Sequence, residues 1–289
     1  MSIRQDRNIV ETLVGRAASD GDGVKLIRVF GGQGPERFDP FLMLDEFGSD
    51  QAADYIGGFP SHPHRGFETV TYMLEGRMLH EDHLGNRGLL EPGGVQWMTA
   101  GRGIIHSEMP QQDSGLMRGF QLWINLPAAE KMQPAGYQDL PPADFPAHRL
   151  TNGATLKVIA GDVQLDGQTY SGPIQGKSTE PLYLDLHLPA GGELAIPVAE
   201  HLNALIYVYE GEVELGSGSQ PGKLRSKHLG RLGEGDTVSV RAGESDARLL
   251  LIAGRPLREP IVQYGPFVMN RREEIEQAVL DYRAGRLAS

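Results

Sequence analysis

Short segments of alternating apolar and polar residues, separated by glycine-rich turns, recur through the first half of the chain. They cover residues 69–74, 78–84, 95–99, 103–109 and 118–125. A period of two residues puts one face of each segment into a core, which predicts short antiparallel strands. Several short strands at such spacing indicate a β-sandwich or β-barrel. The glycine, asparagine and proline between them supply the turns.

Length and composition agree with this interpretation. The chain has 289 residues, which allows one large domain or two of ordinary size, and we predict two. Its 38 glycines and 19 prolines exceed the ordinary combined share of about 12%, which disfavours a helical bundle. Hydrophobic residues at 39% and charged residues at 22% are typical of a globular protein with sizeable cores.

The second half of the chain repeats patterns of the first half in a weaker form. Residues 205–211 are similar to residues 70–76, and residues 232–243 are similar to residues 90–101. Internal similarity of this kind indicates that one structural unit occurs twice. We therefore predict an all-β protein built of two tandem antiparallel barrels.

The limits of the two barrels follow from a change of pattern in the middle of the chain. Residues 128–146 contain four prolines and no sustained period, which is typical of a connection that crosses a surface. We predict an N-terminal barrel over 1–130, a linker over 131–149 and a C-terminal barrel over 150–289.

The C-terminal end of the chain predicts one amphipathic helix. Asn270 stands three residues before Glu273, a spacing suited to a capping box at a helix N-terminus. Ile275, Val279 and Tyr282 then fall at helical spacing. We expect this helix to pack on a barrel.

Charge and cysteine content exclude several classes of function. The net charge is −11 and the chain has no long run of lysine and arginine, so direct nucleic-acid binding is not expected. Because the chain has no cysteine, disulfides, zinc–thiolate sites, iron–sulfur clusters and cysteine nucleophiles are excluded. Any metal ion must be held by nitrogen and oxygen atoms.

No segment of the sequence predicts a membrane or an export signal. The first 16 residues mix charges with apolar residues, which is not typical of a signal peptide. The longest aliphatic run, residues 249–253, is far too short to cross a bilayer. We expect a cytoplasmic protein, and we expect it to be a monomer.

Two histidine-containing patterns predict a metal site. His62 and His64 are separated by one residue, and so are His106 and Glu108. In an extended segment, side chains at positions i and i+2 point to the same face. Strands of one barrel can thus bring three imidazoles and one carboxylate together. This donor set suits non-haem iron, and manganese, nickel, copper and zinc are alternatives.

The remaining histidines and the tryptophans are not expected to bind metal. His80 and His83 are expected on a strand that ends at a turn, without a part in the site. The tryptophans are expected in the core or in the wall of a pocket. Surface or packing positions are expected for the other histidines considered: His148, His187 and His228.

Four strings carry a resemblance to a known family: GGFPSHPHRGFETVTYMLEG, HEDHLGNRGLLEPGGVQWMTAGRGIIHSEMP, RGFQLWINLP and QYGPFVMN. They resemble the pirin family of the cupin superfamily, and the likeness extends over nearly the whole chain. The resemblance implies two cupin barrels, with iron (Fe²⁺ or Fe³⁺) in the N-terminal one and no metal in the C-terminal one. The metal ligands of the family fall on His62, His64, His106 and Glu108.

A second carboxylate competes with Glu108 for the metal. Many other cupins take a glutamate a few residues after the two histidines, and Glu68 occupies about that place. Parity along the strand leaves Glu68 on the same face as His64. The resemblance to pirins favours Glu108, and Glu68 is then expected to orient an imidazole through its free N–H group.

The second barrel does not repeat these ligands. Its sequence has His201-Leu-Asn203 where the first has His62-Pro-His64, and its residues 246–250 offer neither histidine nor glutamate. Losing at least three of four ligands abolishes tight metal binding. We expect the second barrel to pack against the first and to shield it.

The resemblance implies two functions of different classes. The first is quercetin 2,3-dioxygenase activity, in which O₂ opens a small aromatic flavonol and carbon monoxide is released. Glu108 would act in catalysis as the general base that takes the proton of the flavonol 3-hydroxyl. The alternative is a metal-dependent regulatory partner of transcription factors or metabolic enzymes, without catalysis. We favour the enzyme, because open coordination positions exceed what a structural metal site needs.

Overall fold

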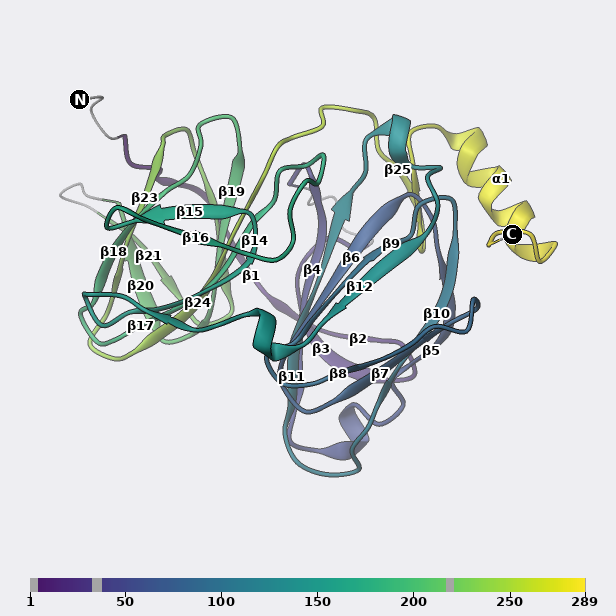
Figure 1. Cartoon of the computed structure of the whole chain (residues 1–289), viewed down its shortest axis with the longest axis horizontal. Helices are drawn as coiled ribbons and strands as arrows, with labels where there is room; N and C mark the ends of the chain where they lie inside the picture. The colour runs from purple at the N-terminus through teal and green to yellow at the C-terminus, as the bar shows by residue number, and fades with distance from the viewer. Residues whose placement is uncertain (1–4, 33–37, 217–220, 289) are drawn as a thin grey trace. The chain divides into compact units, whose positions relative to one another are not determined.

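The computed structural model describes residues 5–32, 38–216 and 221–288 (Figure 1). The chain divides into two compact units, and each unit takes residues from two separate parts of the sequence. We name the unit of Arg16–Asp144 and Leu257–Ser289 the histidine unit, because it contains the paired histidines. The unit of Met1–Gly15 and Phe145–Pro256 is named the aliphatic unit after its core.

Two antiparallel sheets form the barrel of the histidine unit. The larger has the order β12-β9-β6-β11-β4-β3-β2, with β2 (Arg16–Asp20), β3 (Val24–Phe30), β4 (Phe41–Ser49), β6 (Phe67–Glu75), β9 (Val95–Thr99), β11 (Met117–Asn125) and β12 (Gly136–Leu140). The smaller has the order β5-β10-β7-β8, with β5 (Phe59–His64), β7 (Met78–Asp82), β8 (Arg87–Leu90) and β10 (Ile104–Pro110). Short 3₁₀ turns lie at η1 (Ala52–Asp54), η2 (Ala128–Glu130) and η3 (Pro142–Asp144). The five predicted strands are thereby confirmed as β6, β7, β9, β10 and β11.

The aliphatic unit repeats this pair of sheets. Its larger sheet has the order β1-β22-β19-β24-β17-β14-β13, with β1 (Ile9–Val14), β13 (His148–Arg149), β14 (Thr155–Ala160), β17 (Leu182–Leu188), β19 (Asn203–Glu210), β22 (His228–Leu232) and β24 (Ala247–Gly254). Its smaller sheet has the order β18-β23-β20-β21, with β18 (Glu193–Pro197), β20 (Glu212–Leu215), β21 (Gly222–Arg225) and β23 (Thr237–Ala242). A separate hairpin is made by β15 (Asp162–Leu165) and β16 (Gln168–Ser171). Two barrels of the same strand order confirm the predicted all-β fold.

The predicted C-terminal helix is present as α1 (Arg272–Arg283), and a hairpin of β25 (Val262–Tyr264) and β26 (Phe267–Met269) precedes it. Its cap lies one residue later than predicted, since Glu274 accepts the backbone N–H groups of Asn270 and Arg271. Glu274 also binds the Arg271 side chain, which holds its carboxylate at the helix start. Ile275 packs into an apolar cluster with β26, as its spacing predicted, whereas Tyr282 is 42% exposed.

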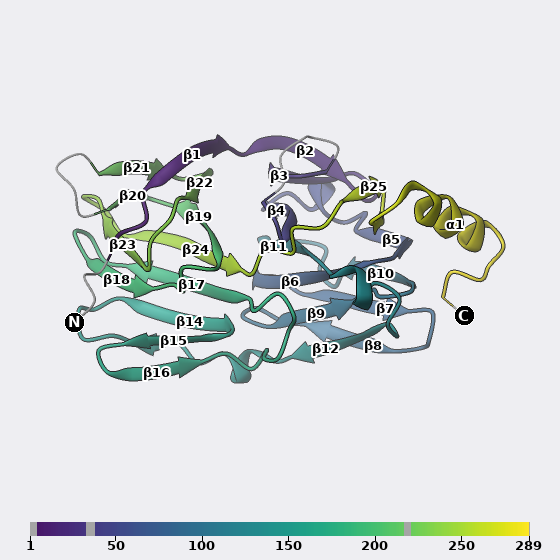
Figure 2. The same cartoon turned by 90° about the horizontal axis from the view of Figure 1, so that it is seen from above.

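Arg65 ties the C-terminal segment to the histidine unit. This buried arginine donates to Asp281 at 2.9 Å, to the carbonyl of Leu287 at 3.2 Å, and to the carbonyl of Arg102. Ile105 of β10 also packs against the apolar cluster of α1 and β26, and Figure 2 shows β25 and α1 beside β5 and β10. The C-terminal helix thus lies in the same unit as the paired histidines, which differs from the predicted C-terminal barrel over 150–289.

The predicted linker over 131–149 also differs from the structure. Gly136–Leu140 forms β12 and pairs with β9 at the edge of the larger sheet. Its side chains are half-buried or exposed, so the segment has no apolar alternation that a sequence could reveal. Lys131 is fully buried and donates hydrogen bonds to Gly66, Asn125 and Val268. In this part of the sequence the boundary between the units falls between Asp144 and Phe145.

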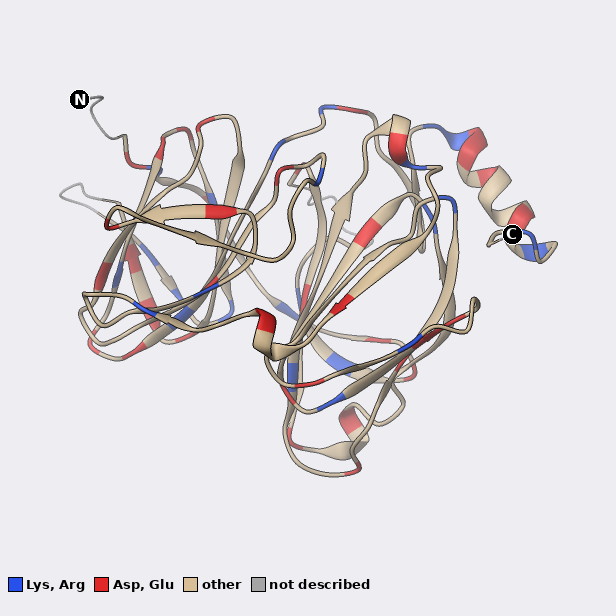
Figure 3. Ribbon diagram, in the orientation of Figure 1, with Lys and Arg blue, Asp and Glu red and all other residues tan. Residues whose placement is uncertain are grey.

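Acidic and basic residues are interspersed along the ribbon of each unit (Figure 3). Within the described part of the chain, no helix has the length and apolar character that a membrane span needs.

Candidate metal centre

The paired histidines lie on two neighbouring strands of the smaller sheet. His62 and His64 are on β5, and His106 is on β10 directly opposite His62. Strand β5 is at the edge of its sheet, where its prolines cost no hydrogen bond of a central strand. Pro63 therefore separates the two histidines without breaking the pairing, and both imidazoles face the same side.

The three imidazoles converge in the structure. One nitrogen from each of His62, His64 and His106 lies within 4.8 Å of the other two. The Nε2 atoms of His62 and His64 are 2.9 Å apart. Nδ1 of His62 lies 2.8 Å from the carbonyl oxygen of Pro60, which can only accept, so Nδ1 carries the proton and Nε2 the lone pair. A lone pair aimed at this point is what a metal ligand requires.

The burial of these rings also fits a bound metal ion. His64 and His106 are 3% and 2% exposed. Among the described residues, the buried His106 Nε2 and His64 Nδ1 have no hydrogen-bond partner. An unpartnered buried nitrogen is costly, and coordination of the His106 Nε2 would remove that cost.

Electrostatics keep the buried rings neutral. Burial lowers the pKa of His64 well below its ordinary 6.5, and charge on His62 lowers it further. Burial likewise lowers the pKa of His106, with the neighbouring His64 as the next cause. Neutral imidazole is the form that binds metal, so both rings are ready to coordinate near neutral pH.

Glu108 lies on β10 two residues after His106 and is 3% exposed. Thr71 donates to its Oε1 at 3.0 Å, and Gln121 donates to its Oε2 at 3.0 Å. Glu108 is not a member of the group of donor atoms that lie within 4.8 Å of one another among the described residues. The structure therefore brings the three histidines together, and Thr71 and Gln121 hold the Glu108 carboxylate on β10, two residues after His106.

Glu68, the competing carboxylate, lies on β6 and is 2% exposed. Its Oε1 accepts a hydrogen bond from Thr99 at 2.6 Å. Its expected action on an imidazole stays a prediction.

His80 is a direct neighbour of the site, although it was expected on its strand without a part in the site. It lies on β7 directly opposite Glu108, and its Nδ1 is 3.3 Å from Nδ1 of His106. The side chain is 2% exposed, and its ring centroid is 5.1 Å from that of Tyr137. The available signal was its place in a predicted strand, because every second residue of that strand faces the interior.

A cavity of about 940 Å³ opens beside the histidines. Its lining includes His62, His64, Gln121 and Trp123, together with residues of the β25–β26 hairpin. Cavities of roughly 300–1,000 Å³ hold small organic ligands. The Trp123 ring lies 5.3 Å from His64 and 4.3 Å from Phe67 between centroids, which confirms the expected place of this tryptophan in a pocket wall.

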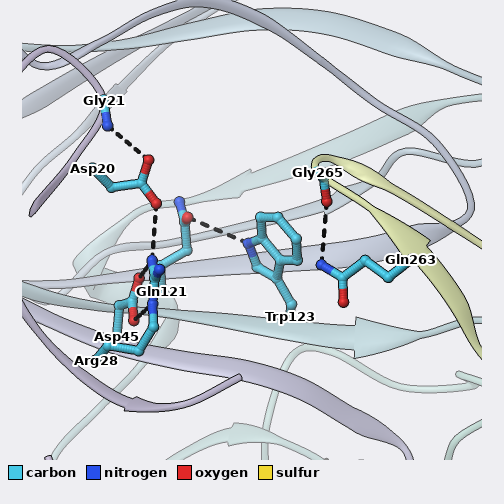
Figure 4. A network of polar contacts seen from close by, with 8 residues as sticks. All are labelled: Asp20, Gly21, Arg28, Asp45, Gln121, Trp123, Gln263 and Gly265. Carbon is cyan, nitrogen blue, oxygen red and sulfur yellow. Dashed lines mark hydrogen bonds and ion pairs between the residues drawn. The ribbon is translucent and has the colours of Figure 1, made fainter. Parts of the chain in front are cut away.

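Charged residues occupy another part of the cavity wall (Figure 4). Arg28 donates to both oxygens of Asp45, at 3.0 and 2.8 Å, and to Asp20 at 2.8 Å. Burial raises the pKa of Asp45 above its ordinary 3.8, and the Arg28 hydrogen bonds oppose that shift. Among the described lining residues, Asp20, Asp22 and Asp45 are acidic and Arg28 is the one arginine. The wall is thus net acidic, and its guanidinium is already paired.

Two family models match the chain: that of pirin over residues 23–124 and that of the pirin C-terminal cupin domain over residues 183–288. The protein named "Putative quercetin 2,3-dioxygenase PA3240" of Pseudomonas aeruginosa is 59% identical over 283 residues, covering 98% of both chains. Human pirin is 41% identical, covering 96% of this chain and 92% of its own.

A solved structure agrees with these relatives. The crystal structure of quercetin 2,3-dioxygenase from Acinetobacter baumannii superposes with a TM-score of 0.87 at 32% identity, and the match covers 99% of each chain. Family models over both barrels and relatives along nearly the full length give one answer: the chain belongs to the pirin family.

Proposed function

We propose that this pirin is a mononuclear non-haem iron quercetin 2,3-dioxygenase, which opens flavonols with O₂ and releases carbon monoxide. The observation that carries the proposal is the convergence of three imidazoles, two of which, His62 and His64, line a ligand-sized cavity. The relatives support it, because one at 59% identity and a solved structure at 32% identity carry the name of this activity.

His62, His64 and His106 would hold the iron through nitrogen atoms, and Glu108 would supply the carboxylate ligand. This nitrogen and oxygen donor set suits iron and leaves room for further ligands. When bound, iron supplies Lewis-acid polarisation of a substrate oxygen and the redox chemistry that O₂ requires. The choice of iron over other transition metals is part of the proposal.

In this reaction the protein must accept one proton, that of the flavonol 3-hydroxyl. A flavonol and O₂ give an ester and carbon monoxide, both oxygen atoms of O₂ stay in the ester, and the carbon that carries the 3-hydroxyl leaves. The 3-hydroxyl proton must therefore be taken up, and we assign its uptake to the buried carboxylate of Glu108, which returns the proton to the new carboxylate of the product. Thr71 and Gln121 each donate to this carboxylate and fix its direction.

The cavity wall favours an uncharged aromatic substrate. Trp123 offers a flat apolar face next to His64. The guanidinium of Arg28 is paired with Asp45 and Asp20, so it is not available for a carboxylate of a substrate. Phenolic hydroxyls, in contrast, can donate to the acidic wall.

The monomeric state and the cytoplasmic location stay predictions from the sequence.

Metal analysis and an aerobic assay test the proposal together. Protein purified from its native host should hold one iron ion per chain, because the described residues contain one three-histidine group. Quercetin should then disappear with O₂ uptake and carbon monoxide release in equal amounts. Metal-loaded protein that binds quercetin but forms no carbon monoxide would overturn the dioxygenase assignment. Stoichiometric zinc without iron would overturn the choice of metal.

A further inference from the structure

Gln121 is the residue that connects the cavity to Glu108. It lines the cavity and donates from Nε2 to Glu108 Oε2 at 3.0 Å. Glu108 itself is not among the described residues that line the cavity. The amide of Gln121 is therefore a polar group that touches both the open space and the buried carboxylate.

The direction of the Gln121 amide is set by its other neighbour. Trp123 Nε1 lies 3.4 Å from Gln121 Oε1 (Figure 4), and an indole nitrogen can only donate. The amide oxygen must then face Trp123, and the amide nitrogen must face Glu108. Trp123 thereby excludes the flipped amide, which would turn an oxygen towards the carboxylate.

Proton counting around Thr71 agrees with this direction. The Thr71 hydroxyl has one proton, which goes to Glu108 Oε1. The same hydroxyl can accept, and Gln121 Nε2 lies 3.5 Å from its oxygen. Thr71 and Gln121 are directly opposite in the pairing of β6 with β11, so the backbone register holds both donors in place. Each oxygen of Glu108 receives one hydrogen bond and keeps a lone pair.

We propose that Gln121, with its amide direction set by Trp123, is a positioning residue that fixes the Glu108 carboxylate for metal ligation. The inference rests on the proposed function, since it requires Glu108 to act on the metal. Groups that orient a metal ligand typically change metal affinity about 10–100-fold when they are removed. Gln121 should act on the metal only through Glu108.

A double-mutant cycle tests this dependence. Gln121→Leu, Glu108→Ala and the double variant are loaded with cobalt(II), and metal affinity is measured by competition with a chelator. Visible absorption of the cobalt(II) protein reports the ligand set independently of activity. Gln121→Leu alone should weaken binding about 10–100-fold and shift the absorption bands towards those of Glu108→Ala. In the Glu108→Ala background it should change the affinity by less than about twofold, which is the usual error of additivity.

Two further variants separate orientation from packing. Trp123→Phe keeps an aromatic ring beside His64 but removes the N–H group, so it should weaken cobalt binding less than Gln121→Leu and again only when Glu108 is present. Gln263→Leu makes the same substitution elsewhere in the cavity wall, at a residue that donates to Gly265 in its own hairpin, and should leave cobalt affinity unchanged.

The outcomes distinguish this inference from the proposed function. Equal effects of Gln121→Leu with and without Glu108 would overturn the inference alone and leave Glu108 as a ligand. A Glu108→Ala variant with wild-type affinity and spectrum would overturn both, because Gln121 would then have no ligand to position.

Discussion

The two barrels carry different side chains on matching strands. In the histidine unit Gln121 lies opposite Thr71 in the pairing of β6 with β11. Four residues after Thr71, Glu75 lies opposite Arg118 in the same pairing. In the aliphatic unit Leu251 lies opposite Ile206 in the pairing of β19 with β24. Four residues after Ile206, Glu210 lies opposite Arg248. A glutamate opposite an arginine thus occurs at the same place in both larger sheets, so it shows which residues of the two barrels correspond. The donors that hold Glu108 in one barrel are thus aliphatic residues in the other.

The smaller sheets show the same replacement. His106 pairs with His62 and Glu108 pairs with His80, whereas the corresponding strand pairs of the aliphatic unit are Val238 with Ile196 and Val240 with Leu215. These four aliphatic residues, and Val198 next to them, belong to one buried apolar cluster. Such a core offers no nitrogen or oxygen donor to a metal. One strand framework thus supports either a polar centre or an apolar core, depending on a few interior side chains.

The largest difference between the two barrels is expected when one imidazole of the histidine unit is removed and the matching residue of the aliphatic unit is shortened. His106→Ala should lose more metal affinity than the roughly 10–100-fold cost of changing a group outside the ligands. Val238→Ala, at the matching position, should keep the metal and lower the free energy of unfolding by about 1–3 kcal/mol. Elemental analysis after dialysis against a chelator measures the first effect, and urea unfolding measures the second. Full metal retention in His106→Ala would contradict the assignment.

Two glutamates of the histidine unit should differ in a similar way. Glu108→Ala should remove most of the bound metal, whereas Glu68→Ala should weaken binding about 10–100-fold, as expected for a carboxylate that acts through a ligand. Metal titration of both variants under one buffer makes the comparison. The reverse order of affinities would make Glu68 the carboxylate ligand.

Gln121 and Leu251 occupy matching positions, and exchanging their residue types should lower the free energy of unfolding by unequal amounts. Leu251→Gln buries an amide among aliphatic side chains, and each unsatisfied polar group costs about 1–3 kcal/mol. Gln121→Leu leaves a single buried group, the Oε2 of Glu108, without its donor, so it should lower the free energy of unfolding by less than Leu251→Gln, which leaves both polar atoms of the amide unpaired. Denaturant unfolding of the metal-free variants tests the difference. Equal losses would show that the two interiors tolerate polarity alike.

The metal-free protein should also show a pH dependence of its stability. The pKa values of His64 and His106 are lowered by burial, so the unfolded chain takes up protons near the ordinary pKa of 6.5 while the folded chain does not. Stability should therefore fall as the pH drops below about 6.5, by at most about 1.4 kcal/mol per pH unit for each histidine. His106→Val, which imports the residue type of the aliphatic unit, should remove the contribution of one ring. Identical slopes for the variant and the wild type would contradict this origin.

The local part of the candidate site was predictable from the sequence. His62, His64, His106 and Glu108 occur in i, i+2 pairs, and strand parity alone puts each pair on one face. The partners Thr71, Gln121 and His80 were not predicted. They meet Glu108 and His106 only through strand register between distant segments, which no local pattern encodes.

The alignment of the two barrels shows a second limit of sequence reasoning. The similarity of residues 232–243 to 90–101 matched β23 with β9, yet β23 takes the place of β10 in its sheet. Likewise β18, and not residues 201–203, takes the place of β5. Glycine-rich turns before unrelated strands produced the misleading likeness, because turn chemistry repeats more readily than strand position. At the corrected positions the described residues are aliphatic: Ile196, Leu215, Val238 and Val240.

The β25–β26 hairpin has a consequence for synthesis of the protein. It supplies part of the wall of the cavity beside the histidines. Residues 145–256 of the aliphatic unit, however, are translated after the strands that carry the histidines and before this hairpin. The first barrel thus leaves the ribosome with an incomplete cavity, which is closed only after the other unit has been made. Joining segments so distant in sequence carries a loop-closure entropy that local folding avoids. Completion of the binding cavity is therefore a late event in the synthesis of this chain, because it follows that of the whole second barrel core.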